Sequence, residues 1–248
     1  MSRATRIWKR TGRVLKLIVA LVITFVFALL AWRIWQDRDP REMTTLSVNE
    51  QIHRVYTENG ENLTILTQEQ NTITRGTNNY GYFSVTQDLL LPEVNQIQLL
   101  FRYNNSTIRA LGTDYNLSEL PARESEIYDV TVLLAIDLTP DDVSDNASND
   151  PASVRFVRVH ASAAPTAAQS TLYNYRRFVF DVGSSGEDLA ALMDSGLLLA
   201  IYADVYYNQD IDYDKNPYGA LCLYDYKTKT ETVKLTRHDR KALDAFGG

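Results

Sequence analysis

IYDVTVLLAIDL, residues 127 to 138, is the stretch that decides the fold class predicted from the sequence. Every second side chain in it, from Tyr128 onward, is apolar, whereas Asp129, Thr131 and Asp137 occupy three of the intervening positions. A period of two places alternate side chains on opposite faces of a β-strand. This stretch therefore predicts a strand that turns one face toward a hydrophobic core.

Similar alternation recurs through most of the chain after residue 60. It predicts further strands over residues 62–67, 80–91, 95–103, 154–160, 172–182, 197–207, 218–226 and 230–235. The last two strands are close in sequence, which predicts a hairpin through residues 226–229. Residues 161–169, rich in alanine, are expected to form a surface loop. The stretch SVNEQIHRVY, residues 47–56, indicates neither a helix nor a strand clearly.

Signals for helices are few. In GSSGEDLAALMDSG, residues 183–196, Ser184 followed by Glu187 resembles a capping box and predicts a short helix. Thr236 followed by Asp239 marks the start of a C-terminal helical turn. Strands that do not alternate with helices favour antiparallel sheets. We therefore expect a mostly β domain, an antiparallel β-sandwich with one or two short helices.

A strongly apolar segment precedes this domain. LIVALVITFVFALLAW, residues 17–32, contains no charged residue, glycine or proline. The whole apolar span, residues 14–35, would form a helix of roughly 33 Å, against a hydrocarbon core of about 30 Å. The sequence thus predicts a single transmembrane helix over residues 14–35 that serves as an uncleaved signal anchor. A cleaved signal peptide is the alternative, although no small-residue cleavage site follows Ala31.

The charges beside this span predict its orientation. Six Lys and Arg residues and no acidic residue precede Leu17, which favours a cytoplasmic N-terminus. We therefore expect a basic cytoplasmic tail over residues 1–13, a short stalk over residues 36–45 and an extracytoplasmic domain over residues 46–248. The protein would be a single-pass protein of the cell membrane.

The net charge of −6 is divided unevenly along the chain. Residues 1–41 carry +7 and the remaining residues carry −13, so the domain is not expected to bind nucleic acid or anionic lipid. The single cysteine, Cys222, cannot form an intramolecular disulfide, and core packing alone must hold the domain together. A cysteine-poor extracytoplasmic domain behind such an anchor indicates a bacterial protein.

Two neighbouring arginines lie in the strand predicted over residues 172–182. Because adjacent residues of a strand point to opposite faces, Arg176 and Arg177 cannot both face solvent on one side. One of them is expected to point inward, where it needs a carboxylate or an aromatic ring as its partner.

The sharpest candidate for a metal site is NQDIDYDKN, residues 208–216. Asp210, Asp212 and Asp214 occupy alternate positions in it. In an extended or looped backbone this spacing points three carboxylates the same way, and such a group suits Ca²⁺, the candidate cofactor. Lys215 stands where an EF-hand loop needs its sharp-turn glycine, so a solvated turn between two strands is the simpler interpretation.

Tyrosine is frequent, with 15 residues against 8 phenylalanines. In the predicted strands Tyr202 and Tyr206 share one face, and Tyr218 and Tyr224 share another. Flat aromatic surfaces stack on sugar rings and also suit protein interfaces. These four residues are the candidate ligand-binding residues, although tyrosine is also common in strands for packing alone.

No catalytic signature is recognisable in the sequence. His53, His160 and His238 lie far apart, and paired carboxylates such as Glu124 and Glu126 only permit glycoside hydrolysis. The leading hypothesis is a binding or scaffold module that acts on an envelope or membrane protein near the membrane surface. A domain that binds cell-envelope polysaccharide, with or without calcium, is the alternative, and a hydrolase is the third hypothesis.

Overall fold

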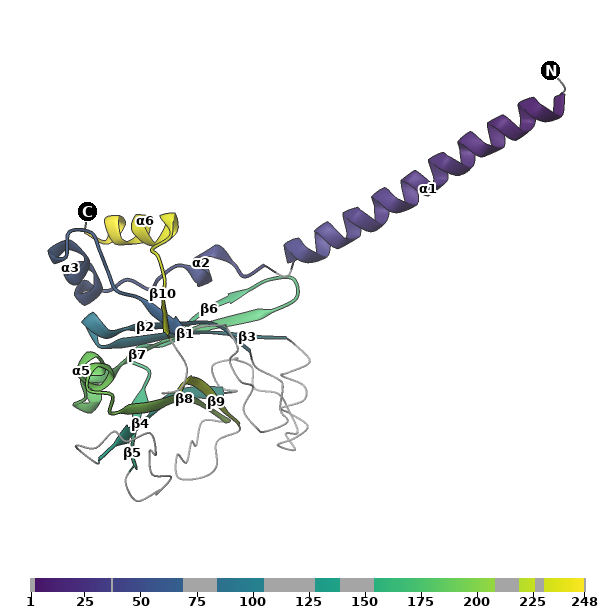
Figure 1. The fold of residues 1–248 in the computed structure, drawn as a ribbon. Helices are drawn as coiled ribbons and strands as arrows, with labels where there is room; N and C mark the ends of the chain where they lie inside the picture. Colours follow the sequence, from purple (N-terminus) through teal and green to yellow (C-terminus); the bar gives the residue numbers. More distant parts are fainter. Residues whose placement is uncertain are drawn as a thin grey trace. The chain divides into compact units, whose positions relative to one another are not determined.

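The computed structural model describes residues 3–36, 38–68, 84–104, 128–138, 154–207, 219–225 and 230–247. The chain forms two compact units, of which the first holds residues 1–39 with 170–172 and the second holds the remainder. Helix α1 (Arg3–Gln36) belongs to the first unit, and the described strands belong to the second (Figure 1).

Helix α1 is one continuous helix of 34 residues. Its segment Leu15–Gln36 is long and apolar enough to cross a membrane, a test that a signal sequence near an N-terminus also passes. Large apolar side chains such as Phe25, Phe27 and Trp35 are exposed along it. A helix that is apolar on all sides requires apolar surroundings.

The second unit contains two antiparallel sheets. Sheet A has the strand order β10-β1-β2-β3-β7-β6, and sheet B has the order β5-β4-β8-β9. The strands of sheet A are β1 (Leu66–Gln68), β2 (Ser84–Leu91), β3 (Gln96–Tyr103), β6 (Thr166–Gln169), β7 (Asn174–Asp181) and β10 (Thr230–Thr232). Those of sheet B are β4 (Tyr128–Asp137), β5 (Val154–His160), β8 (Leu198–Tyr207) and β9 (Gly219–Asp225). The prediction of a mostly β fold with antiparallel sheets is confirmed.

Two predictions about strand pairing are wrong. The strands on either side of residues 226–229 do not form a hairpin, because β9 pairs with β8 in sheet B whereas β10 pairs with β1 in sheet A. Residues 166–169, expected in a loop, form β6 and pair with β7. Alternation along a strand shows which side chains share a face, but it carries no information about the neighbouring strand.

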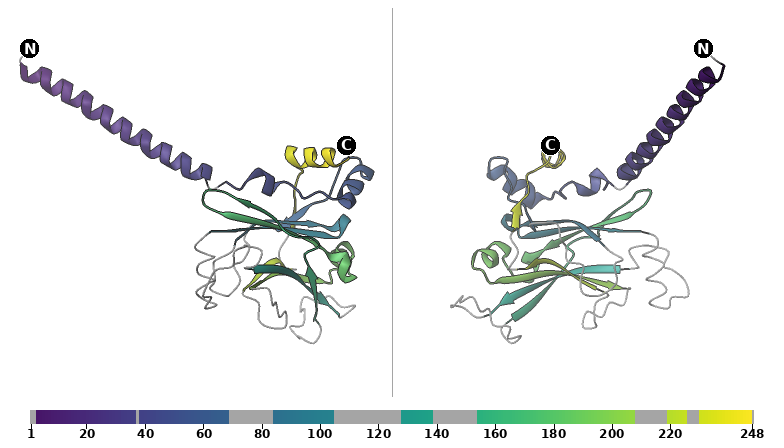
Figure 2. Two further views of the ribbon diagram at one scale, coloured as in Figure 1. Left: turned by 180° about the vertical axis from the view of Figure 1, so that it is seen from behind. Right: turned by 45° about the vertical axis from the view of Figure 1, so that its right-hand side comes forward.

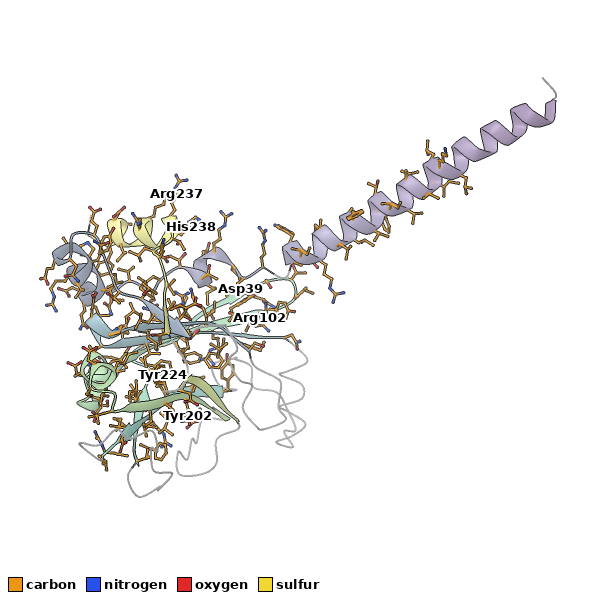
Figure 3. All side chains as sticks on the ribbon, in the orientation of Figure 1. Asp39, Arg102, Tyr202, Tyr224, Arg237 and His238 are labelled. Carbon is orange, nitrogen blue, oxygen red and sulfur yellow. The ribbon has the colours of Figure 1, made fainter. Side chains whose placement is uncertain are left out.

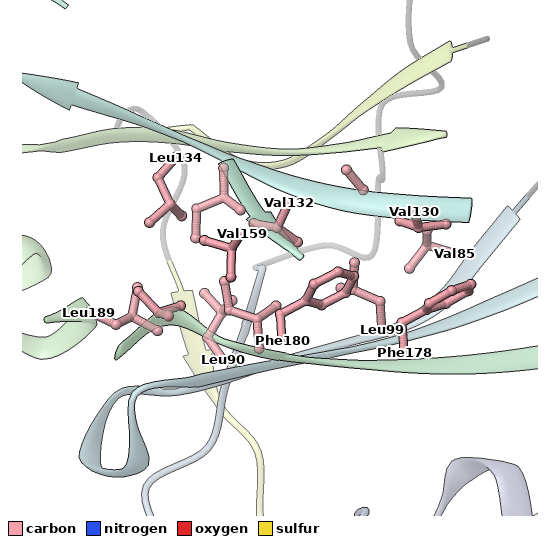
Figure 4. Packing of buried hydrophobic residues seen from close by; sticks show 14 of the residues in the cluster. Val85, Leu90, Leu99, Val130, Val132, Leu134, Val159, Phe178, Phe180 and Leu189 are labelled. Carbon is pink, nitrogen blue, oxygen red and sulfur yellow. The ribbon is translucent and has the colours of Figure 1, made fainter. Parts of the chain in front are cut away.

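Apolar side chains from both sheets form one buried cluster. Figure 2 shows the sheets as two layers, and side chains fill the space between them (Figure 3). In the close view of Figure 4, Phe178 and Phe180 of sheet A face Val130 and Val132 of sheet B. All four side chains are fully buried, and burial of each contributes about 1.5 to 3 kcal/mol. This shared core joins the two sheets.

Helices cover the outer face of sheet A. They are α2 (Arg41–Thr44), α3 (Glu50–Glu58) and α6 (Arg237–Phe246) (Figure 2). A second buried cluster lies beneath them and includes Ile52 of α3, Leu243 of α6 and Leu89 of β2. The sequence did not indicate α3, which begins where the Asn49 side chain accepts a hydrogen bond from Ile52 N at 2.9 Å.

The two helices predicted from capping patterns have different outcomes. Helix α6 begins at the predicted capping box of Thr236 and Asp239. The helix expected to start at Ser184 is divided into a 3-10 turn, η4 (Val182–Ser185), and α5 (Leu189–Asp194). Gly186 separates them because its φ of +81° lies in the left-handed region, which a right-handed helix cannot include.

Arg176 and Arg177 on β7 point to opposite sides of sheet A, as predicted. Arg176 is buried on the core side, where its guanidinium lies 4.5 Å from the ring centre of Tyr128 and 4.8 Å from that of Phe178. It also donates a hydrogen bond to Tyr128 O at 2.8 Å. The expected aromatic partners of an inward arginine are therefore present.

Arg177 points to the outer face, where the chain enters the domain. Its guanidinium donates hydrogen bonds to Met43 O, to Thr45 O and, at 3.0 Å, to Gln87 Oε1. Burial lowers the pKa of Arg177 to about 10, and the Asp239 carboxylate opposes this shift. The guanidinium therefore stays charged at neutral pH.

Residues 43–47, named here the entry segment, are held to the outer face by side chains. The further hydrogen bonds are Gln87 Nε2 to Thr44 O (3.1 Å), Gln98 Nε2 to Ser47 O (2.8 Å), Ser47 N to Gln98 Oε1 (2.9 Å) and Leu46 N to Asp239 Oδ1 (2.7 Å). Met43 and Leu46 are buried, with 2% and 3% of their surface exposed. Part of the region expected to be a stalk, residues 41–45, thus packs on the sheet.

We predict that Arg177→Met lowers the free energy of unfolding by about 3 kcal/mol, because two backbone carbonyls of the entry segment lose their buried donor. Urea unfolding of the full chain in detergent measures this change. Arg54→Met, on the exposed surface of α3, is the matched control and should change the free energy by less than about 0.5 kcal/mol. Equal effects of the two variants would contradict the assigned role of Arg177.

Candidate binding cleft

A cleft of about 480 Å³ is lined by residues from both sheets. Its walls come from β1 and β10 at one edge of sheet A, β9 at one edge of sheet B, α5, and the 3-10 helix η1 (Pro92–Val94). Glu93, Asp194 and Tyr224 supply its main functional groups, and Leu66 and Met193 supply apolar surface. The volume lies within the range of about 300 to 1,000 Å³ that is usual for ligand sites.

Asn95 fixes η1 against α5. It ends η1 in the left-handed conformation, with φ of 55°, which asparagine tolerates better than most residues. Its side chain accepts a hydrogen bond from Leu189 N and donates one to Glu187 O, both at 2.7 Å. Glu93 of η1 and Asp194 of α5 are thereby brought to the same cleft.

The two carboxylates of the cleft differ in how firmly they are held. Glu93 accepts hydrogen bonds from Thr64 Oγ1 at 2.6 Å, from Thr64 N at 3.2 Å and from Asn59 Nδ2 at 3.4 Å. These uncharged donors orient the carboxylate but bring no positive charge to compensate it. Asp194 is the last residue of α5 and is exposed. The cleft therefore presents two exposed anions, of which Glu93 is held in one orientation by its hydrogen bonds.

Tyr224 forms part of the wall contributed by β9. It lies opposite Ile201 of β8 and packs partly against the core shared by the sheets. Burial raises the pKa of its phenol, and the neighbouring Asp225 carboxylate raises it further. The phenol therefore stays neutral well into the alkaline range, so that its ring retains the electron-rich face of a neutral aromatic group.

The composition of the cleft favours a cationic ligand with an apolar stem. None of the described residues that line it is a Lys, Arg or His. A Lys or Arg side chain can lay its methylene groups on Leu66 and Met193 while its charged end meets the two carboxylates and the Tyr224 ring. A tyrosine beside carboxylates also suits a sugar ring.

The structure does not bring the four predicted tyrosines together. Tyr202 lies opposite Leu133 and Cys222, whereas Tyr224 lies opposite Ile201, whose side chain is in the core. Tyr202 and Tyr224 therefore belong to opposite faces of sheet B, and both are labelled in Figure 3. Tyr206 lies in β8, and Tyr218 lies outside the described residues. Among the described residues that line the cleft, Tyr224 is the one that the sequence predicted.

The remaining candidates lie elsewhere. Asp210, Asp212 and Asp214 are outside the described residues, so the calcium hypothesis stays a prediction. Within the part of the chain that the structure describes, no three His, Cys, Asp or Glu side chains form a group able to hold a metal ion. His53 and His238 belong to α3 and α6, on the outer face of sheet A, and His160 ends β5 in sheet B.

Sequence reasoning missed Glu93 and Asp194. Each is an ordinary acidic residue in a short helix, and the two are far apart in the chain, so only the folded structure shows that they share a cleft. Comparison of the chain with protein-family models, curated proteins and solved structures found no match. The function must therefore be inferred from the side chains of the chain itself.

We predict that Tyr224 contributes stability that is lost at alkaline pH. Its pKa is raised in the folded state, so this contribution is complete below about pH 10, the ordinary value, and declines as the pH rises through the folded-state value. As the pH rises above about 10, the free energy of unfolding of the unaltered protein should therefore fall relative to that of Tyr224→Phe. Tyr56, whose pKa burial also raises, is present in both proteins and cancels. A constant difference across the range would refute the assignment.

Proposed function

We propose that this chain is a membrane-anchored binding module, in which an extracytoplasmic β-sandwich uses its cleft to hold a basic side chain of a protein partner near the membrane surface. The composition of the cleft carries this proposal. Glu93, Asp194 and Tyr224 converge with apolar Leu66 and Met193, and no described lining residue is cationic. Lys and Arg are the side chains that combine an apolar stem with a positive end.

The anchor and the orientation are supported by the apolar helix and its basic flank. Residues 15–36 are helical and long enough to span a bilayer, and the cations that precede Leu17 favour a cytoplasmic N-terminus. The domain would then face the outside of a bacterial cell membrane. The β-sandwich architecture is supported by two antiparallel sheets that share one buried core.

The positions of the charged groups in the cleft suit a protein partner better than a small ligand. Its two carboxylates lie on separate short helices at the rim of both sheets, an arrangement that suits the basic side chains of a partner segment. The short connection after α1 keeps the domain within reach of other membrane proteins.

Binding of envelope polysaccharide is the second candidate function. It is favoured by Tyr224, whose ring lies in a cleft with two acceptor carboxylates, the groups that commonly hold a sugar. A hydrolase has less support. Both oxygens of Glu93 already accept hydrogen bonds from Thr64 or Asn59, which leaves this carboxylate poorly placed for proton transfer to a substrate.

We predict that the full chain in phosphatidylcholine nanodiscs binds a lysine-containing peptide more tightly than the same peptide with norleucine in place of lysine. Glu93→Gln combined with Asp194→Asn should weaken binding of the lysine peptide about tenfold, because both charge partners of the ammonium are removed. Fluorescence anisotropy of labelled peptides measures both affinities. The zwitterionic lipid avoids direct attraction of the peptide to the disc.

The control variant, Glu50→Gln combined with Asp244→Asn, removes the same two negative charges from exposed positions of α3 and α6. It should leave the affinity within about twofold, since distant exposed charges are screened by salt. Equal affinity for the two peptides, or an equal loss of affinity in both double variants, would overturn the proposal that the cleft binds a basic side chain. Binding of envelope polysaccharide fragments that the cleft variants abolish would establish the second candidate instead.

A further inference from the structure

Four cations gather at the start of the C-terminal helix. They lie in KLTRHDRK, residues 234–241, and are Lys234, Arg237, Arg240 and Lys241, all of them exposed. Figure 3 shows Arg237 on the side of α6 away from the sheets. Residues 42–248 carry a net charge of −13, so this positively charged segment, named here the basic patch, has the opposite sign to its surroundings.

The acidic residue within the basic patch does not neutralise it. Asp239 is buried and turned inward, where it accepts hydrogen bonds from Leu46 N at 2.7 Å and from Thr236 N at 2.8 Å. Within the part of the chain that the structure describes, the side chains of Lys234, Arg237, Arg240 and Lys241 form no ion pair and no hydrogen bond. The four positive charges are therefore available to a partner.

The position of these cations is unfavourable for the helix itself. Arg237, Arg240 and Lys241 lie within the first five residues of α6, where the helix dipole disfavours positive charge. The capping box and the buried Leu243 stabilise α6 without them. An anionic surface against this end of the helix would remove the unfavourable interaction.

The length of the connection limits how far the basic patch can lie from the end of the proposed anchor. Leu46 N donates a hydrogen bond to Asp239, and the chain takes ten residue steps from Gln36 to Leu46, four of them in α2. At about 3.5 Å per extended residue and about 1.5 Å per helical residue, this connection reaches at most roughly 27 Å.

We propose that the basic patch of α6 binds the anionic lipid headgroups of the bilayer in which α1 is anchored, an inference that rests on the proposed anchor. The net charge of the whole domain disfavours such binding, but only charges within a Debye length of about 8 to 10 Å act strongly on the surface. Each Lys or Arg at an anionic surface strengthens the contact about fivefold. The acidic remainder of the domain is repelled, which turns α6 toward the lipid.

The test uses the full chain in vesicles, with an environment-sensitive fluorescent amino acid in place of exposed His238. A nitroxide-labelled lipid headgroup quenches the probe when α6 touches the bilayer. Quenching should be at least about threefold greater in phosphatidylglycerol-containing vesicles than in phosphatidylcholine vesicles, and added salt should reduce it. A probe in place of Ser195, after α5, should respond equally to both lipids, because α5 packs into the core between the sheets whereas α6 covers the outer face of sheet A.

Neutralising the patch with Arg237→Gln, Arg240→Gln and Lys241→Gln together should lower quenching at position 238 to its level in phosphatidylcholine. Asp244→Asn, which removes an exposed acid from the same helix, should increase quenching. Circular dichroism of each variant confirms that α6 is still formed.

The outcomes separate this inference from the proposal on which it rests. Release of the chain from the vesicles by alkaline carbonate would overturn the anchor and with it the inference. An anchored chain whose probe is quenched equally in both lipids would overturn the inference alone. Quenching that the triple neutralisation leaves unchanged would also overturn it, and peptide binding in the cleft is measured independently of either result.

Discussion

The buried charge of Arg177 is the constraint on which the outer face of sheet A depends. A guanidinium in this position must have fixed acceptors, and it takes two of them from the backbone of the entry segment, at Met43 and Thr45. This determines where the chain joins the sheet. Leu46 is then placed so that its N–H reaches Asp239, which also completes the capping box of α6 with Thr236. One buried cation is therefore linked to the position of both the entry segment and the C-terminal helix.

The cleft depends in a similar way on one uncharged residue. Asn95 adopts a left-handed conformation that ends η1, and its amide binds the backbone on both sides of the start of α5. These two hydrogen bonds join the end of η1 to the start of α5. Glu93 and Asp194 share a cleft because Asn95 holds the backbones that carry them. A polar contact within the fold thus sets the geometry of the site.

The sequence predicted most of the local structure because the signals involved are local. The alternation in residues 127–138 predicted β4, and Thr236 with Asp239 predicted the start of α6, since each pattern reflects side chains that are close in the chain. The partner of β10 could not be predicted, because β1 lies far away in sequence and its three residues carry little alternation. The cleft was missed for the same reason, because Glu93, Asp194 and Tyr224 become neighbours only through sheet topology. Pairing of distant segments is decided by the whole core.

The net charge of this domain does not predict which surfaces it can bind, because its positive and negative side chains are unevenly distributed. The net charge of −13 on residues 42–248 describes the electric field at a distance, whereas a surface in contact with the domain interacts with only the nearest few side chains. The entry segment fixes where the chain joins the domain. If α1 is the anchor proposed above, a single point of attachment allows the cleft to face in many directions. A second contact, such as basic α6 against an anionic bilayer, would reduce these directions to a few, and a partner in the same membrane would then meet the cleft at a defined height.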